Sequence, residues 1–245
     1  VHGKETLIGV MGSKPIHLMT PEERKQSISL KDFFIDLGLP KEEVEKYIEV
    51  GNPVTREREL IEMGDCVNCK SLDNRVSVFI LIEVLRELKD QEIPYDLFGV
   101  FTVQEEVGIR GAMVAAHHIE PDFSFGLDTT IAYDLPGAKP EEMVSKMGEG
   151  TAIKIMDSST ICDVRMVDFM KKTADKYKLK WQTELLPAGG TDTAGMQRMS
   201  TKGTIAGAVS IPTRHIHQVI EMSNKHDIRG SIDLLKGCVS ELDTH

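Results

Sequence analysis

Hydrophobic residues follow two different patterns along the chain, and the change between them falls near residue 65. Before that point, short apolar stretches at residues 7–11 and 33–37 are separated by prolines, which predicts short strands joined by turns. A helix is expected over residues 41–48, because Pro40 stands at its start and glutamates crowd its first turn. The chain is therefore expected to divide at this point into a small, strand-rich part and a larger part.

After residue 71, helical and strand-like stretches alternate. The first helix is apolar nearly all round in its first half, which predicts that this half is buried. The strand that follows is an almost continuous apolar run, which is typical of an inner strand covered on both faces. The alternation predicts an α/β fold, with a mostly parallel sheet and helices on both faces. Helices are expected at 75–89, 110–118, 164–177 and 227–242, and strands at 97–102, 123–127, 151–156 and 204–210.

Composition excludes several classes of protein. The 245 residues suffice for one large domain, or one domain with a smaller lobe, and 40% hydrophobic and 28% charged residues are ordinary for a globular protein. A net charge of −10 argues against nucleic-acid binding. No apolar run is long enough to span a membrane, and the first residues lack the features of a signal peptide. We therefore expect a cytoplasmic protein that binds neither nucleic acid nor membrane.

The four cysteines are expected to be free thiols. Cys66 and Cys69 form a C-x-x-C pair, while Cys162 and Cys238 stand alone. A structural zinc site would require a second pair at similar spacing, and a redox motif would require a thioredoxin-like context. Neither is present, so ordinary thiols in a reducing compartment are the favoured interpretation.

Carboxylate and imidazole groups follow the predicted strands, at the ends where ligands bind in open α/β sheets. Glu105 and Glu106 follow the first apolar strand, and Asp128 follows the second. Asp73 precedes the first helix of this part, and His217 follows the last strand. Several carboxylates with a single histidine suit Zn²⁺, Co²⁺ or Mn²⁺ in a hydrolytic site.

Each of these residues also has an ordinary structural explanation. Neighbouring side chains at the end of a strand point in different directions, so one of Glu105 and Glu106 can bind a metal while the other acts as a base. Two glutamates in such a place can also simply be solvated. Asp128 can be a turn residue and Asp73 a helix cap, and His217 can be a core histidine. The hypothesis of a hydrolytic metal site therefore rests on the combination.

Five motifs, in the same order, resemble those of the TET-type (tetrahedral) dinuclear metallo-aminopeptidases, some of which have been labelled endoglucanases. The resemblance covers nearly the whole chain, and five ordered motifs make it specific. The motifs are SLDNRV at 71–76, VQEEVGIRGA at 103–112, LDTT at 127–130 with DLPG at 134–137, GGTD at 189–192 and IPTRHIH at 211–217.

The resemblance implies two divalent metal ions, Zn²⁺ or Co²⁺. Asp73 would bridge the two ions, beside a cis peptide bond to Asn74. Glu106 and His217 would complete one metal site, and Asp128 would bind the other ion. A two-metal site of this kind activates a water molecule and polarises the carbonyl of the bond to be cleaved.

The resemblance also implies an activity and an assembly. Glu105 would be the general base and then the acid that protonates the leaving amine, so that single residues are removed from the N-termini of peptides. Residues 1–65 would be part of an inserted dimerisation domain, and residues 66–245 a catalytic domain without its N-terminal strands. Family members self-associate from dimers into tetrahedral dodecamers.

Two departures from the family pattern leave alternatives open. His215 stands where the family usually has tyrosine, and no H-x-D element occurs, although the family takes a further metal ligand from one. We expect that element upstream of Val1. One alternative is therefore a weak or inactive paralogue that acts only in assembly. A glycosidase is less favoured, because adjacent glutamates alone cannot flank a sugar bond.

Overall fold

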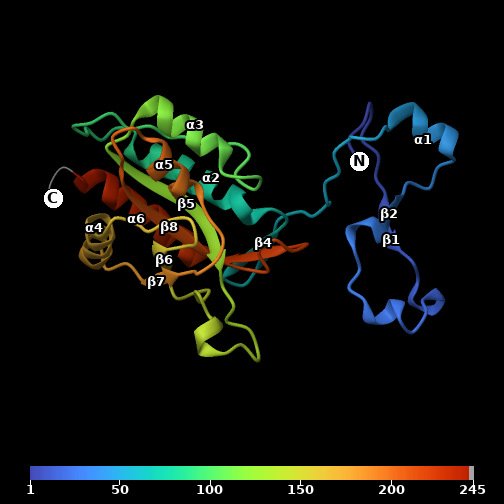
Figure 1. Ribbon diagram of the computed structural model, residues 1–245. Helices are drawn as coiled ribbons and strands as arrows, with labels where there is room; N and C mark the ends of the chain where they lie inside the picture. Colours follow the sequence, from blue (N-terminus) through green and yellow to red (C-terminus); the bar gives the residue numbers. More distant parts are fainter. Residues whose placement is uncertain (243–245) are drawn as a thin grey trace. The chain divides into compact units, whose positions relative to one another are not determined.

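The computed structural model describes residues 1–242, and the chain divides after Glu57 into two compact units (Figure 1). The division lies earlier than the predicted boundary after residue 65. The reason is that β3 (Ile61–Met63) pairs with β4 (Cys66–Cys69), which belongs to the main sheet of the second unit. The expected role of the first unit in dimerisation stays a prediction.

The first unit has little core of its own. Its strands β1 (Val10–Ser13) and β2 (Phe33–Asp36) form an antiparallel pair close to the predicted strands, and α1 (Lys41–Tyr47) confirms the predicted helix. None of the residues in this unit is buried, and many of its large apolar side chains are exposed. Three short 3-10 turns complete it: η1 (Ile16–Leu18), η2 (Glu23–Lys25) and η3 (Leu30–Asp32).

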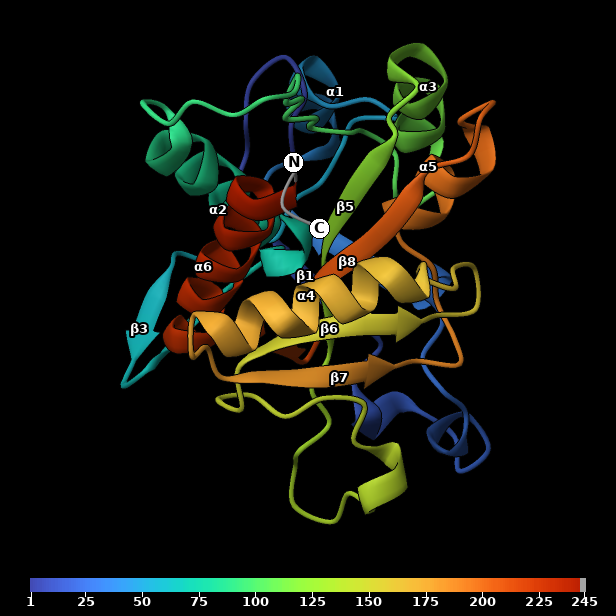
Figure 2. The same ribbon diagram turned by 90° about the vertical axis from the view of Figure 1, so that its left-hand side faces the viewer.

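The second unit is built around one sheet with helices on both faces, which confirms the predicted α/β class (Figure 2). All four predicted helices are present, and α5 was not predicted. The helices are α2 (Leu72–Leu88), α3 (Arg110–Ile119), α4 (Val164–Lys176), α5 (Asp192–Met199) and α6 (Lys225–Glu241). The further strands are β5 (Phe123–Ile131), β6 (Thr151–Met156), β7 (Trp181–Leu185), β8 (Ile205–Arg214) and β9 (Glu221–Asn224).

The sheet is mixed rather than mostly parallel. Its order is β3-β4-β9-β8-β6-β7, with β5 paired to β8. The pairs β5–β8 and β6–β7 are parallel, as predicted for strands joined through helices. The pairs β3–β4 and β8–β9 are antiparallel, because a short connection can join neighbouring strands only in that direction. The β4–β9 and β6–β8 pairs are also antiparallel.

Two apolar clusters hold helices against the sheet. Gly207 of β8 lies against Met166 and Met170 of α4, where a Cβ atom would collide with both side chains. A second cluster joins α2 to α6 through residues such as Ile80 and Ile232. Helices α3 and α5 lie on the opposite side of the sheet from α4 and α6 (Figure 1).

Two predictions about burial and strand formation are wrong. The segment 97–102 is not a strand, and Phe98 within it is 60% exposed. An apolar run forms a strand only where a neighbour supplies hydrogen bonds, and no strand among residues 1–242 pairs with it. The first half of α2 is not buried all round either, since Phe79 is 50% exposed. Both segments border a cavity of about 940 Å³, beside β5, which Leu97, Val78 and Phe125 help to line.

No helix in the described part of the chain is both long and apolar enough to cross a membrane.

The four cysteines are free, as predicted. Cys69, Cys162 and Cys238 are buried, and burial raises the pKa of the Cys162 and Cys238 thiols to about 12. These two thiols are therefore unreactive core residues.

An ion-pair network between α2 and α6 generates a prediction about pH and stability. Glu87 accepts hydrogen bonds from Arg229 at 2.7 Å and from Lys236 at 2.9 Å. These bonds hold the pKa of Glu87 at about 2, below the ordinary 4.5. Because the folded-state pKa lies below the unfolded one, the stabilisation is present above pH 4.5 and is lost as the pH falls toward 2.

We therefore expect Glu87→Gln to lower the free energy of unfolding by about 1 kcal/mol at neutral pH, a modest figure because such pairs are partly solvated. The difference from the unchanged chain should shrink as the pH falls below 4.5. Urea unfolding of both proteins between neutral pH and the acid range measures this difference in the free energy of unfolding. Glu83→Gln, which removes an ion pair with Arg86 within α2 alone, is the control and should cost less. An equal pH dependence with and without Glu87 would contradict the assignment.

Candidate active site

Three of the predicted site residues lie together. One potential ligand atom each from Asp73, Glu106 and His217 lies within 4.8 Å of the others. His217 Nε2 is 3.0 Å from an Asp73 carboxylate oxygen and 3.7 Å from one of Glu106. The Asp73 side chain is only 9% exposed, whereas those of Glu106 and His217 are more than half exposed. The group is therefore anchored at its buried side and accessible from solvent.

Asp73 is placed by an irregular start to α2. Ser71 has left-handed backbone angles, with φ at 51°, and Asp73 departs from helical geometry. The peptide bond between Asp73 and Asn74 is cis, as the resemblance implied. The side-chain amide of Asn74 donates to the backbone carbonyl of Leu127 in β5 at 3.0 Å, which ties this turn to the sheet.

His217 is placed by the turn that follows β8. The strand ends at Arg214, whose guanidinium donates twice to Asp134, at 2.7 Å in each bond. Two histidines of the turn, His215 and His217, both have φ at 61°, which is unusual for residues with a Cβ atom. The backbone N–H of His217 donates to Glu221 at 3.1 Å. His215 is not part of the three-residue group.

Glu105 lies beside this group in a different environment. Burial raises its carboxyl pKa to about 7, and the negative charges of Glu106, Asp192 and Asp73 add to that effect. Asp192 begins α5 and accepts a hydrogen bond from the hydroxyl of Thr102. A carboxyl group whose pKa is near neutrality can both accept and return a proton.

Asp128 lies on β5 and is buried. Its carboxylate accepts the backbone N–H of Thr129 at 2.8 Å. Burial raises the pKa of Asp128 well above its ordinary value, and the charges of Asp73 and Glu105 raise it further. Asp128 is therefore electrostatically coupled to the other site residues, but the structure does not include it in the three-residue group.

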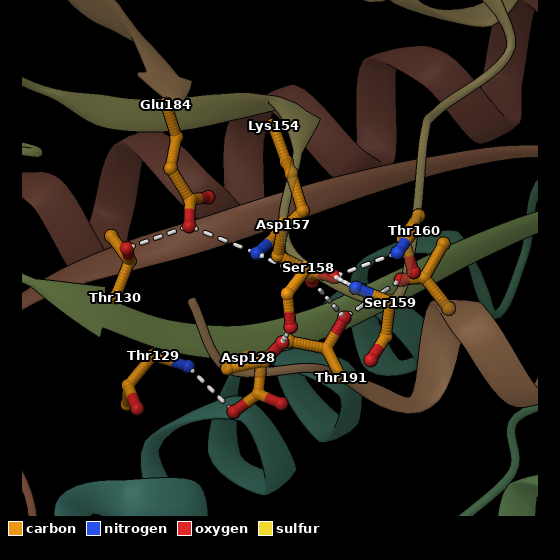
Figure 3. A network of polar contacts seen from close by, with 12 residues as sticks. Asp128, Thr129, Thr130, Lys154, Asp157, Ser158, Ser159, Thr160, Glu184 and Thr191 are labelled. Atoms are coloured by element: carbon orange, nitrogen blue, oxygen red, sulfur yellow. Dashed lines mark hydrogen bonds and ion pairs between the residues drawn. The ribbon is translucent and has the colours of Figure 1, made fainter. Parts of the chain in front are cut away.

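A network of buried polar side chains near Asp128 joins neighbouring strands of the sheet (Figure 3). Lys154 is 1% exposed and donates to Glu184 at 2.9 Å and to Asp157 at 3.1 Å. Glu184 also accepts from the hydroxyl of Thr130, and Asp157 accepts from the hydroxyl of Thr191. Because Thr191 directly precedes α5, this network connects β5, β6 and β7 with the loop that leads to Asp192.

The charges at the site favour a cation. Burial raises the pKa of Asp73 to about 6, with Glu106 adding to the effect and His217 opposing it. Carboxylates that repel one another in this way are stabilised in their charged form by a nearby positive charge. Two carboxylates and one imidazole in reach of a single point are also a typical donor set for a catalytic zinc site with an open position. The residues present thus fit a divalent metal ion.

Two residues of this region were not assigned a role from the sequence. Asp192 stands within the GGTD motif, yet its proximity to Glu105 appears only in the fold. Glu221 accepts backbone hydrogen bonds from both Asp73 and His217. In the sequence, Glu221 stands out only by its position four residues after His217, and that spacing has no specific chemical meaning.

Comparison with known proteins identifies the class. The model of the M42 glutamyl aminopeptidase family matches residues 1–234. A putative aminopeptidase of Acetivibrio thermocellus is 34% identical over 228 residues, which is 93% of this chain and 67% of that protein. The TET aminopeptidase of a marine sediment Thaumarchaeota archaeon has a TM-score of 0.92 at 35% identity, covering 98% of this chain and 68% of that one.

The TET1 peptidase of Pyrococcus horikoshii, which can assemble into a tetrahedron or a large octahedral shell, is also similar. It has a TM-score of 0.83 at 29% identity, over 96% of this chain and 68% of that one. The fold is therefore that of the TET peptidases. The chain belongs to the M42 glutamyl aminopeptidase family, and it spans about two thirds of the length of these relatives.

Proposed function

We propose that this chain carries the catalytic residues of a metal-dependent aminopeptidase that removes N-terminal residues from peptides. The observation that supports this most directly is the group formed by Asp73, Glu106 and His217, with Glu105 beside it. Membership of the M42 family, whose relatives are named as aminopeptidases, gives the reaction class.

Asp73, Glu106 and His217 would hold a divalent ion such as Zn²⁺ or Co²⁺. When bound, the ion would supply Lewis-acid polarisation of the substrate carbonyl and a lower pKa for a water molecule. Asp73 would contribute the fixed part of the site, since its side chain is buried and its backbone is hydrogen-bonded. Glu106 and His217 are exposed and would form the side that meets the substrate.

Glu105 would move the proton. The carboxylate of Glu105 accepts a proton from water as the water oxygen attacks the carbonyl carbon of the first peptide bond. The C–N bond then breaks, and Glu105 returns the proton to the departing amine nitrogen. A pKa of about 7 suits both transfers, because the group gains and loses a proton readily at neutral pH.

The adjacent glutamates provide a test of this division of roles. We expect Glu105→Gln to retain metal binding but to lower kcat by about 10²–10⁴-fold, because only the proton transfer is lost. Glu106→Gln is the matched variant and should weaken metal binding instead. Hydrolysis of a panel of aminoacyl anilides, with metal content measured on the same samples, separates the two effects. A Glu105→Gln variant with unchanged kcat would refute the role of Glu105.

A second ion would be held less tightly than the first. Asp73 and Asp128 are the two carboxylates available to it from the predicted set, without an imidazole, whereas tight catalytic zinc usually has three protein ligands. We therefore expect about one tightly bound ion per chain, measured by elemental analysis after dialysis. Asp128→Asn should leave that ion in place, and His217→Ala should remove it. Two tightly bound ions would contradict this prediction, and none would favour a non-catalytic assembly protein.

Self-association is proposed for the first unit. It contains no buried residue, and Ile8 and Leu30 are 77% and 89% exposed. Exposed apolar surface of this extent is typical of an interaction site. A structural neighbour, the P. horikoshii TET1 peptidase, can assemble into a tetrahedron or a large octahedral shell. We also propose a cytoplasmic location, in keeping with four free cysteines.

We expect the chain to form at least a dimer, and light scattering after size-exclusion chromatography measures its mass. Ile8→Glu or Leu30→Glu should shift the chain toward the monomer, because a buried charge is costly at an apolar interface. Ile161→Glu, at a 73% exposed apolar residue of the second unit, is the control and should leave the mass unchanged. A monomeric unmodified chain would refute the proposal.

A further inference from the structure

Glu221 joins the two parts of the chain that supply Asp73 and His217. It is the first residue of β9 and is 3% exposed. One of its carboxylate oxygens accepts the backbone N–H of Asp73 at 2.8 Å, and the other accepts the backbone N–H of His217 at 3.1 Å. A single buried carboxylate therefore fixes the main chain at two residues that are far apart in the sequence.

The local backbone does not fix either residue by itself. His217 has φ at 61°, in the left-handed region that residues with a Cβ atom rarely adopt. Asp73 has ψ at 107°, which departs from the helix that begins around it. Hydrogen bonds from N–H groups to a charged carboxylate are among the strong ones in proteins. Glu221 is thus well suited to hold both unusual conformations.

The backbone of Glu221 is itself held by the sheet. Glu221 lies opposite Cys69 in the antiparallel pair of β4 and β9. Both carboxylate oxygens are engaged by main-chain N–H groups, and Glu221 is not a member of the three-residue group. It therefore acts on that group through the residues it supports.

We propose that Glu221 is a positioning residue that sets the distance between the Asp73 carboxylate and the His217 imidazole, and so the affinity of the site for a divalent ion. This inference rests on the proposed function, because it assumes that these two side chains bind the ion. Residues that support metal ligands typically change metal affinity by about 10–100-fold when they are replaced.

A second buried carboxylate offers a matched control. Asp227, in the first turn of α6, is 1% exposed and accepts the backbone N–H groups of Gly148 and Gly150 at 2.6 and 2.8 Å. It has the same kind of partners as Glu221, but neither partner is a candidate ligand. Loss of Asp227 should therefore affect stability without affecting the metal site.

The experiment compares Glu221→Gln and Asp227→Asn in the whole chain. Binding of Co²⁺ and Zn²⁺ is measured by titration calorimetry, the visible absorption of the Co²⁺ form reports the ligand geometry, and urea unfolding of the metal-free protein reports stability. A glutamine carbonyl can accept one of the two N–H groups, but its amide is itself a donor and cannot accept the other.

We expect Glu221→Gln to weaken binding of both ions by about 10–100-fold and to change the Co²⁺ spectrum. Asp227→Asn should lower stability but leave affinity and spectrum unchanged. Glu221→Asp keeps the negative charge on a shorter side chain. Its metal affinity should lie between that of the unmodified chain and that of Glu221→Gln. This variant also provides the test if the glutamine variant does not fold.

Unchanged affinity and spectrum in Glu221→Gln, or in Glu221→Asp where only that variant folds, would overturn the positioning role and leave the proposed function intact. An equal loss of affinity in Asp227→Asn would also overturn it, because the effect would then be general destabilisation. An unmodified chain that binds neither ion would instead overturn the proposed metal site, and this inference with it.

Discussion

Hydrogen bonding between β8 and its neighbours is the constraint on which the second unit depends. Strand β8 pairs with β5 along its length on one side, and with β6 and β9 on the other. Asp128 is carried by β5, while the turn bearing His217 connects β8 to β9. The register of one strand therefore determines where residues from several segments lie, and a slip in that register would separate them.

Concentrated negative charge is the second physical feature of the site. Asp73, Glu105 and Asp128 all have raised carboxyl pKa values, and burial is the largest cause in each case. The buried Lys154 is paired with Glu184 and Asp157 rather than with these site carboxylates. The negative charge of the site is therefore left for a cation to balance, which is the usual arrangement in a metal-dependent hydrolase.

The two units differ in what stabilises them. The second unit has two apolar clusters, which join α4 and α6 to the sheet and α2 to α6. The first has a two-stranded sheet, one helix and no buried residue. A unit of that kind buries little apolar surface, so it gains less stability from hydrophobic packing than the second unit does.

Local sequence patterns were enough to predict the α/β class, four of the helices and the family, because helical periodicity and ordered motifs are local properties. The sequence also gathered Asp73, Glu105, Glu106, Asp128 and His217 into one hypothesis. The structure brings three of them, Asp73, Glu106 and His217, within reach of a single ion. Two features could not be predicted in this way: segment 97–102 is not a strand, and the sheet is mixed. Both depend on which strands become neighbours in the folded chain. The same holds for Glu221, whose chemistry in isolation is that of any surface glutamate. Its burial and its two backbone partners arise from strand pairing between distant segments, which no local pattern encodes.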